Sequence, residues 1–446
     1  MRIVLLCGGS GRRLWPLSND IRSKVFLKIL KSGDGTRESM IQRICRQLDE
    51  VDLLQSACIM THNSQVEIAR KHVGESIPII GEPYRRGTFT AAALAASYLH
   101  EKMQADPNEI VCMLPVDTFA DSRFFQLLHR FPEVLSRSKA ELALLGTKPK
   151  LPSSQYGYIV PELPGQSDEY AVVRRFVEKP ERRLAISLMK QCALWNCGVF
   201  AFALKFMLVF LKDKGLPAQV ENLLACYEQL NVASFDQEVA EHARHAVVMA
   251  YDGLWKDLGS WEALSGHFED KVIGSGRLSD DSVNTHIINE LPYPIEVIGA
   301  SDFIVAAGFD GILIAKKDKA NRIKENFVSA SQIPMSGEKR WGSFQVYNYW
   351  KDGQGRETMI QKVEIAQGKN TSYHQHFKRK EILTVLSGSA EIILDHTLHR
   401  LQAGDVLEIP IGAKHGIKAI TKLELLEVQL GVGMDTDDIV RLAMNW

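Results

Sequence analysis

The sequence predicts a multi-domain protein that begins with an α/β domain and ends with an all-β domain. The chain has 446 residues, which corresponds to two to four domains at roughly 100–200 residues each. In its first third, short apolar runs alternate with stretches of helical spacing, the pattern of an α/β domain. Toward the C-terminus, apolar runs follow one another with only short turns between them, which is typical of a β-barrel or β-sandwich.

Five short apolar runs in the first third are predicted to be buried strands. Three stretches between them have the spacing of amphipathic helices, Ser39–Leu48, Ser64–Val73 and Thr90–Met103. Alternation of this kind indicates a mainly parallel sheet covered on both faces, with ligands beyond the carboxyl ends of the strands. The five runs are Ile3–Cys7, Ala57–Met60, Ile77–Ile80, Ile110–Leu114 and Leu142–Leu145.

The rest of the chain is β-rich. Short β-type runs with frequent glycine extend from Lys271 to Phe327, and the polar, breaker-rich stretch Ala330–Lys339 is a predicted linker. We therefore expect domains at 1–270, 271–329 and 340–446. The strands expected after the linker are Ser343–Trp350, Thr358–Ile365, Ile382–Leu386, Ala390–Leu394, Val406–Ile409 and Glu424–Gln429.

Composition excludes several classes of protein. Lys and Arg (53) almost balance Asp and Glu (54), so no overall charge attracts nucleic acid or anionic membrane, and any anion site is local. Seven cysteines without a CxxC pair indicate reduced thiols rather than a disulfide framework or a cysteine zinc site. No apolar run has the length of a signal peptide or a membrane span. We expect a cytoplasmic protein without nucleic-acid or membrane partners.

A glycine-rich turn directly follows the first predicted strand. Three glycines allow a tight turn that presents backbone N–H groups to phosphate, with cationic side chains close by in the sequence. A P-loop is excluded because no Gly-Lys-Ser/Thr follows, and Leu14 stands where the dinucleotide fingerprint has its third glycine. The glycines alone are equally compatible with a plain turn. The residues concerned are Gly8, Gly9, Gly11, Arg12, Arg13 and Lys24.

Six motifs in order, spread over about 250 residues, carry a family resemblance. They are GGSGRRLWPLS, LPVD, YGYI, FVEKP, WNCGVFAF and WKDLGSWEAL. Together they resemble the sugar-phosphate nucleotidyltransferases, and the LWPLS ending resembles the bacterial mannose-1-phosphate guanylyltransferase branch. The resemblance implies a Rossmann-like first domain, a left-handed β-helix segment over 271–329, and a homodimer.

The resemblance also implies a reaction and a set of site residues. A sugar phosphate attacks the α-phosphate of an NTP while pyrophosphate leaves in line, so the protein mainly positions the substrates and neutralises charge. Asp117 and Asp257 would hold Mg²⁺, an ion suited to carboxylate oxygens. Arg13 and Lys24 would stabilise the phosphates and the leaving group. The residues implied to bind the sugar phosphate are Gly157, Glu178, Lys179 and Asn196.

The favoured substrates are GTP and mannose 1-phosphate, which give GDP-mannose for polysaccharide biosynthesis. Two departures from the family leave the base and the sugar open. The family reads Arg-Asn-Thr where this chain has Arg86, Gly87 and Thr88, and Lys-Gln-Phe where it has Lys24-Val25-Phe26. Another NTP, another sugar phosphate and a non-catalytic sugar-nucleotide sensor are the alternatives. A sensor is disfavoured because it needs no leaving-group and metal residues together.

The C-terminal region resembles a cupin with a complete metal-ligand set. His374 and His376 are two residues apart on a predicted strand and so point to the same side, while Glu381 and His415 come from neighbouring strands. Three imidazoles and one carboxylate suit Zn, Fe, Mn or Ni. The module resembles the type II mannose-6-phosphate isomerase cupin, except that Phe377 and Lys378 replace two histidines. An isomerase and a purely structural or dimerising cupin therefore both stay open.

Overall fold

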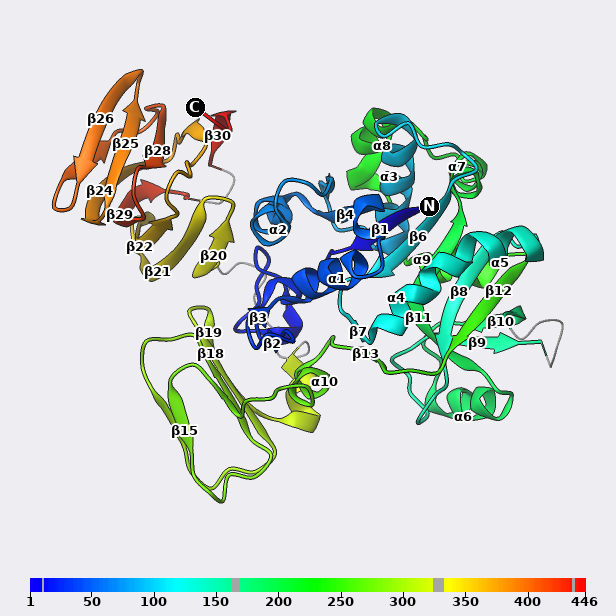
Figure 1. Ribbon diagram of the computed structural model, residues 1–446. Coiled ribbons are helices and arrows are strands. Elements are labelled where there is room, and N and C mark those ends of the chain that lie inside the picture. The colour runs from blue at the N-terminus through cyan, green and yellow to red at the C-terminus, as the bar shows by residue number, and fades with distance from the viewer. Residues whose placement is uncertain (10–11, 163–168, 324–332, 435–437) are drawn as a thin grey trace. The chain divides into compact units, whose positions relative to one another are not determined.

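The computed structural model describes residues 1–9, 12–162, 169–323, 333–434 and 438–446. The chain forms two compact units (Figure 1). The first unit consists of Met1–Gly9 and Val25–Phe268, and the second of Ser10–Lys24 and Glu269–Trp446. The segment that follows the glycine-rich turn therefore belongs with the C-terminal half of the chain.

A nine-stranded sheet forms the centre of the first unit, in the order β5-β4-β1-β6-β11-β8-β12-β10-β9. All five predicted strands are present, with their ends within two residues of the expected positions. The strands are β1 (Arg2–Leu6), β4 (Ala57–His62), β5 (Ile79–Glu82), β6 (Ile110–Pro115), β8 (Leu142–Thr147), β9 (Tyr158–Pro161), β10 (Ala171–Val177), β11 (Leu194–Ala203) and β12 (Ala246–Tyr251).

The sheet is mixed, so the prediction of a mainly parallel sheet was only partly right. Strands β5, β4, β1 and β6 run parallel, but β11 is antiparallel to both β6 and β8. Strands β9 and β10 are antiparallel to each other as well. A strand buried on both faces is apolar along its length whichever way it runs, so apolarity alone did not reveal this direction.

Helices pack on both faces of this sheet (Figure 1). Ser39 caps α1 with a capping box, in which its hydroxyl and the side chain of Gln42 each satisfy a backbone N–H. Helix α3 is rich in alanine and almost wholly buried, and with α7 and α8 it covers one face. The helices are α1 (Met40–Asp49), α2 (Val66–Val73), α3 (Thr88–Glu101), α4 (Ser122–Gln126), α5 (Phe131–Ser138), α6 (Arg182–Lys190), α7 (Leu204–Asp213), α8 (Val220–Cys226), α9 (Phe235–Glu238) and α10 (Trp261–Ser265).

Two short antiparallel ribbons complete the first unit. One pairs β2 (Leu30–Lys31) with β3 (Arg37–Glu38). The other pairs β7 (Thr118–Ala120), which follows β6 directly, with β13 (Trp255–Asp257). The second ribbon places two widely separated acidic motifs side by side.

The connector is a stack of short strands, as its glycine-rich β pattern indicated. Parallel pairs join β14 to β16, β16 to β18, and β15 to β17, and the hairpin β18–β19 ends the stack. The strands are β14 (Val272–Ile273), β15 (Gly276–Leu278), β16 (His286–Asn289), β17 (Ile295–Val297), β18 (Phe303–Gly308) and β19 (Gly311–Lys316).

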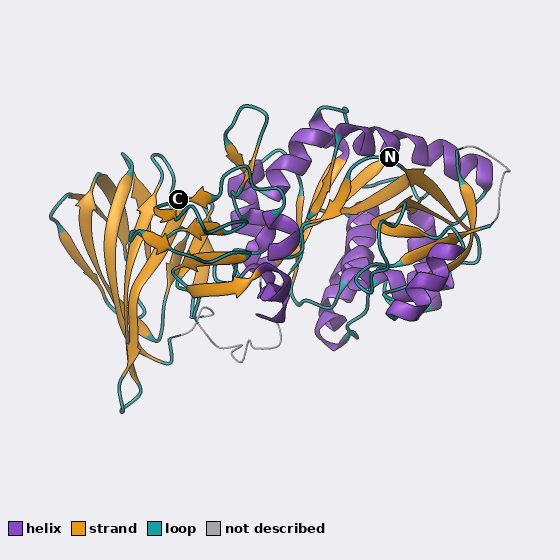
Figure 2. Cartoon of the chain, turned by 90° about the horizontal axis from the view of Figure 1, so that it is seen from below, coloured by secondary structure: helices purple, strands orange, loops and turns teal. Residues whose placement is uncertain are grey.

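Two antiparallel sheets enclose the C-terminal core (Figure 2). The order of the six-stranded sheet is β20-β21-β22-β29-β24-β27, and that of the five-stranded sheet is β26-β25-β28-β23-β30. The strands are β20 (Ser336–Lys339), β21 (Gly342–Lys351), β22 (Arg356–Ile365), β23 (Tyr373–Gln375), β24 (Arg379–Ser387), β25 (Ser389–Leu394), β26 (Thr397–Gln402), β27 (Val406–Ile409), β28 (His415–Ala419), β29 (Leu423–Val432) and β30 (Val440–Ala443).

Part of the predicted linker is a strand. Residues 336–339 form β20 and pair with β21 in spite of their polar composition, because the ladder uses backbone groups, and residues 330–332 lie outside the described part of the chain. All seven cysteines fall within the described ranges and are free thiols. In the same ranges, no helix has both the length and the apolarity that crossing a membrane requires.

Candidate functional sites

Of the two predicted magnesium ligands, Asp117 lies between β6 and β7, and Asp257 is the last residue of β13. Asp257 pairs with Thr118, and the N–H of Leu258 donates to the carbonyl oxygen of Asp117 at 3.1 Å. Both aspartates are half-buried. Two motifs separated by about 140 residues of sequence are therefore neighbours in space, and they provide two carboxylates at one edge of the sheet.

Tyr156 lies close enough to these two carboxylates for their charges to affect its pKa. Burial, together with the charges of Asp257 and Asp117, raises the pKa of Tyr156 to about 12. Its ring packs on Trp195 and Trp255, with centroids 4.8 and 5.5 Å away. The tyrosine falls within the predicted YGYI motif but was not among the expected site residues. Because a phenol in this position stays protonated, it offers an O–H donor beside the acidic pair.

Three of the predicted sugar-phosphate residues lie together. The N–H of Asn196 donates to the carbonyl oxygen of Gly157 at 2.8 Å. A Cβ on Gly157 would lie 2.7 Å from Oε2 of Glu178 and 3.4 Å from Cβ of Asn196, so glycine is what allows this approach. The fourth residue, Lys179, is largely exposed, adopts the left-handed φ of +42° and forms an ion pair with the Glu178 carboxylate.

Asp236 belongs to this cluster, although sequence reasoning missed it. Nδ2 of Asn196 donates to its Oδ1 at 2.8 Å, while Oδ1 of Asn196 accepts the N–H of Gly198 at 3.0 Å. Burial, followed by repulsion from Glu178, raises the pKa of Asp236 to about 6. The residue stands in the four-residue helix α9 outside every recognised motif, so no local pattern pointed to it.

Gly8 and Gly9 follow β1, and a buried acid lies beside them. Glu82, at the end of β5, accepts a hydrogen bond from the Tyr227 hydroxyl at 2.8 Å through Oε2. Its Oε1 lies 3.6 Å from where a Cβ on Gly8 would stand. Burial raises the pKa of this carboxyl. Glu82 is a second residue that the motif analysis missed, since its partner Tyr227 is 145 positions away.

The other described residues of the predicted nucleotide-binding set, Arg12, Arg13 and Lys24, all belong to the second unit. Gly11 lies outside the described residues, and Arg12 begins the 3-10 helix η1 (Arg12–Leu14). Arg13 is exposed, and Lys24 is half-buried at the start of the 3-10 helix η2 (Lys24–Phe26). Arg13 and Lys24 both belong to the second unit, and their roles toward phosphate stay predictions.

Gly87, where the family has asparagine, sits in a conformation that requires glycine. Its φ is +93°, and a Cβ would lie 2.2 Å from the carbonyl oxygen of Ala233. The same carbonyl accepts the N–H of Phe89 at 3.2 Å, and the N–H of Ala233 donates to Arg86 at 3.0 Å. The departure from the family motif therefore goes together with a close backbone contact at the start of α3.

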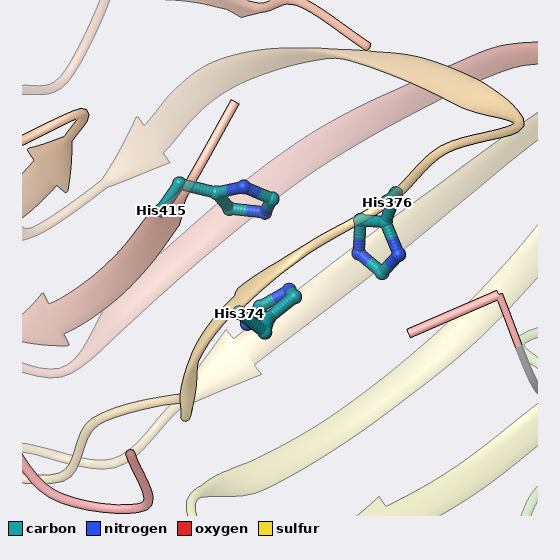
Figure 3. Close-up of side chains that lie close together, drawn as sticks. All are labelled: His374, His376 and His415. Atoms are coloured by element: carbon teal, nitrogen blue, oxygen red, sulfur yellow. The ribbon is translucent and has the colours of Figure 1, made fainter. Parts of the chain in front are cut away.

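The four predicted cupin ligands converge on one point. His374 on β23, His376 just beyond it and His415 on β28 direct their rings toward a shared space (Figure 3). Their ligand atoms all lie within 4.8 Å of one another. The Glu381 carboxylate is 3.4 Å from Nε2 of His376 and 3.2 Å from Nε2 of His415. The i, i+2 spacing had predicted the shared side of His374 and His376, and the cupin resemblance had added Glu381 and His415.

Backbone contacts set the tautomer of each histidine. Nδ1 of His374 contacts the carbonyl oxygen of Ser372 at 2.7 Å, Nδ1 of His376 contacts that of Asp438, and Nδ1 of His415 contacts that of Ala413 at 3.1 Å. A carbonyl only accepts, so each Nδ1 carries a hydrogen and each Nε2 faces the inside of the cluster. This is the usual arrangement around metal-binding histidines.

Charges in the cupin cluster also favour a cation. Burial lowers the pKa of His374 to about 3 and also lowers that of His376, so both are neutral near pH 7. Burial opposes ionisation of Glu381, but His415 and Arg379 more than compensate and lower its pKa. Burial opposes protonation of His415, but the Glu381 carboxylate more than compensates and raises the pKa of this histidine. Two neutral imidazoles beside an ionised carboxylate are ligand types that divalent transition metals use.

Arg379 already contacts two of these ligands. Its Nε donates to Oε1 of Glu381 at 3.0 Å, and its Nη2 donates to Nε2 of His376 at 3.0 Å. Its Nη1 lies 3.5 Å from the Asp438 carboxylate. The guanidinium therefore uses lone pairs that a metal ion would need.

Comparison with known proteins agrees with this geometry. Residues 2–271 match the family model described as nucleotidyl transferase. The chain belongs to the nucleotidyl transferase family. Residues 330–444 match the model described as mannose-6-phosphate isomerase C-terminal. This member of the family is therefore a nucleotidyltransferase enzyme with an isomerase-like C-terminal module, as the motifs predicted.

Relatives of known name align over the whole chain. Mannose-1-phosphate guanylyltransferase of Escherichia coli K12 is 29% identical over 99% of this chain and 97% of its own. The alginate biosynthesis protein AlgA of Pseudomonas aeruginosa is 28% identical over 98% of this chain and 95% of its own. A Thermus thermophilus structure described as mannose-1-phosphate geranyltransferase is 26% identical, with a TM-score of 0.61 over 73% of this chain and 98% of its own.

Proposed function

We propose that this nucleotidyltransferase converts GTP and mannose 1-phosphate to GDP-mannose and pyrophosphate. A phosphate oxygen of the sugar phosphate forms a bond to the α-phosphorus, and the bond from that phosphorus to the bridging oxygen of pyrophosphate breaks. The observation that carries the proposal is the full-length similarity to guanylyltransferases, together with the paired carboxylates of Asp117 and Asp257 beside the β1 and β6 strand ends.

Asp117 and Asp257 are proposed to hold Mg²⁺. The fit is chemical: the site provides two carboxylates, and this ion takes its remaining ligands from water and substrate phosphates. When bound, Mg²⁺ neutralises charge that develops on the phosphates. Tyr156 donates its hydroxyl hydrogen toward the same region, and Glu178, Lys179 and Asn196 orient the sugar phosphate.

Glu82 is proposed to read the base. It is 5% exposed and lies next to Gly8, in the turn expected to bind nucleotide. A carboxylate accepts hydrogen bonds but donates none once it is ionised, so it suits the adjacent N1–H and 2-amino donors of guanine. This preference for donors on the base supports GTP over nucleotides whose base presents an acceptor there.

Substitution of Asp257 distinguishes a catalytic transferase from a non-catalytic sugar-nucleotide sensor. We expect Asp257→Ala to abolish pyrophosphate release while the protein still binds GDP-mannose, because the carboxylate serves the reacting phosphates and not the product sugar. The matched control is Asp252→Ala, an exposed acid in the loop before β13, which should retain wild-type turnover. Full turnover in Asp257→Ala would contradict the assignment.

A second candidate activity concerns the cupin module. The match to the isomerase model and the three inward Nε2 atoms support a divalent transition metal held by His374, His376, Glu381 and His415. When bound, the metal would polarise a sugar carbonyl. Conversion of mannose 6-phosphate to fructose 6-phosphate by the full chain tests for isomerase activity. The homodimer, the left-handed β-helix connector, the closed cupin barrel and the cytoplasmic location stay predictions.

A further inference from the structure

The segment of residues 12–24 packs against the connector through its apolar residues. A Cβ on Gly311 would lie 2.4 Å from Cζ2 of Trp15, and one on Gly308 would lie 3.1 Å from Cδ2 of Leu17. Both glycines bound the turn of the β18–β19 hairpin. Residues of the LWPLS part of the signature therefore contact the β18–β19 hairpin of the connector, where these two glycines leave room for them.

Ion pairs of Arg22 hold the C-terminal end of this segment against two glutamates of the second unit. Its Nη1 and Nη2 donate to the two carboxylate oxygens of Glu290 at 2.7 and 3.0 Å, and its Nε lies 3.3 Å from Oε1 of Glu338. Glu290 follows β16 of the connector, and Glu338 lies on β20. The Arg22 side chain is only 14% exposed, so this forked contact is shielded from solvent more than a surface ion pair is.

Asn19 fixes the turn that precedes Arg22. Its Oδ1 accepts the N–H groups of Ile21 and Arg22 at 3.0 and 2.8 Å. Its Nδ2 donates to Oδ2 of Asp310 at 2.9 Å and to the carbonyl oxygen of Ser336 at 3.0 Å. One side chain thus ties the segment both to the hairpin and to the first strand of the C-terminal sheets.

We propose that Asn19 and Arg22 are positioning residues for nucleotidyl transfer, through which the C-terminal half of the chain sets the conformation of segment 12–24 and hence the placement of Arg13 and Lys24. Apart from the 3-10 helices η1 and η2, the segment has no regular structure in its described residues. Its shape therefore depends on these side-chain anchors. The inference rests on the proposed function, which gives Arg13 and Lys24 their phosphate roles.

Weakening these anchors should slow catalysis, because cations that stabilise developing charge must be held in exact positions. Fixed cations stabilise a transition state only when they are held in place beforehand, and a displacement of about 1 Å costs about 100-fold in rate. Loosening the anchors should therefore lower kcat more than it weakens substrate binding. If the anchors only stabilised the fold, removing them would lower the melting temperature and leave kcat per folded molecule unchanged.

The test compares Arg22→Gln with Arg137→Gln in the full chain. Arg137 on α5 also forms ion pairs with two glutamates, Glu133 and Glu169, but it is 59% exposed. We expect Arg22→Gln to lower kcat at least about tenfold with KM changed less than about threefold, and Arg137→Gln to stay within about twofold of wild type. Arg22→Lys keeps the charge without the fork and should recover part of the rate.

Hydrogen exchange provides a readout that does not depend on turnover. Amides of residues 12–24 should exchange at least about fivefold faster in Arg22→Gln than in wild type or Arg137→Gln. Glu338→Gln, a milder change made from β20, should act in the same direction if Arg22→Gln fails to fold. Unchanged exchange, or faster exchange with unchanged kcat, would overturn the proposal. Faster exchange in Arg22→Gln, combined with a wild-type protein that turns over no substrate, would refute the proposed function and, with it, the catalytic role of the anchors.

Discussion

A methyl group added at Gly87 meets two separate penalties. The backbone of Gly87, with φ +93° and ψ 176°, is in a region essentially restricted to glycine, which costs an ordinary residue about 1–3 kcal/mol. A Cβ there would also lie 2.2 Å from the carbonyl oxygen of Ala233, and forcing a group into packed structure costs about 1–3 kcal/mol. We therefore expect Gly87→Ala to lower the free energy of unfolding by about 2–6 kcal/mol.

Alanine substitutions at two other glycines of the first unit distinguish the cost of backbone strain from the cost of the close contact. Gly35 has φ +82° and no described atom within 4 Å of its would-be Cβ, so Gly35→Ala should cost only the strain of about 1–2 kcal/mol. Gly33 has neither feature, and Gly33→Ala should change stability by less than about 1 kcal/mol. Calorimetric unfolding of the three variants gives the order of their losses in stability. If Gly87→Ala is no more destabilising than Gly35→Ala, the close contact with Ala233 is wrong.

Three further predictions concern charged groups. Glu82→Gln should lower kcat/KM for GTP by about 10–100-fold, because the amide places a donor where guanine also donates; an unchanged value contradicts the base-reading role. Because the pKa of Asp236 is raised to about 6 from about 4, its stabilising contribution is full below pH 4 and lost as the pH rises through 6. Asp236→Asn should therefore raise the melting temperature relative to wild type at pH 8 but not at pH 4, and a pH-independent difference would refute this. Arg379→Gln should raise Zn²⁺ affinity at least about tenfold in a chelator competition, since the guanidinium contacts two ligand atoms. The control is Lys380→Gln, which removes an exposed charge paired with Glu408 and should leave the Zn²⁺ affinity unchanged. Equal Zn²⁺ affinities in the two variants would contradict the idea that Arg379 competes with the metal for its ligands.

The sequence predicted what local patterns encode. Apolar runs located the five early strands, and the i, i+2 spacing predicted that His374 and His376 point to the same side. The cupin resemblance added Glu381 and His415 to this pair. Ordered motifs brought Gly157, Glu178 and Asn196 into one expected site, and the structure has them in contact. These inferences use either spacing within one element or motifs whose order resembles that of a known family.

The features that were missed depend on contacts between distant positions. Glu82 meets Tyr227 across 145 residues, and Arg22 meets Glu290 across 268, while neither pair belongs to a recognised motif. Asp236 lies in a short helix with no distinguishing pattern, and its raised pKa arises only once folding brings Glu178 beside it. The direction of β11 was missed because burial makes a strand apolar whichever way it runs.

Pyrophosphate release with Mg²⁺, measured across a matrix of NTPs and sugar 1-phosphates, tests the central claim most directly. The proposed function predicts rapid release with GTP and mannose 1-phosphate and at least about 100-fold less with each other pair. Release with a different pair would keep the in-line transfer but contradict the assigned base or sugar. No release with any pair would contradict the transferase function itself.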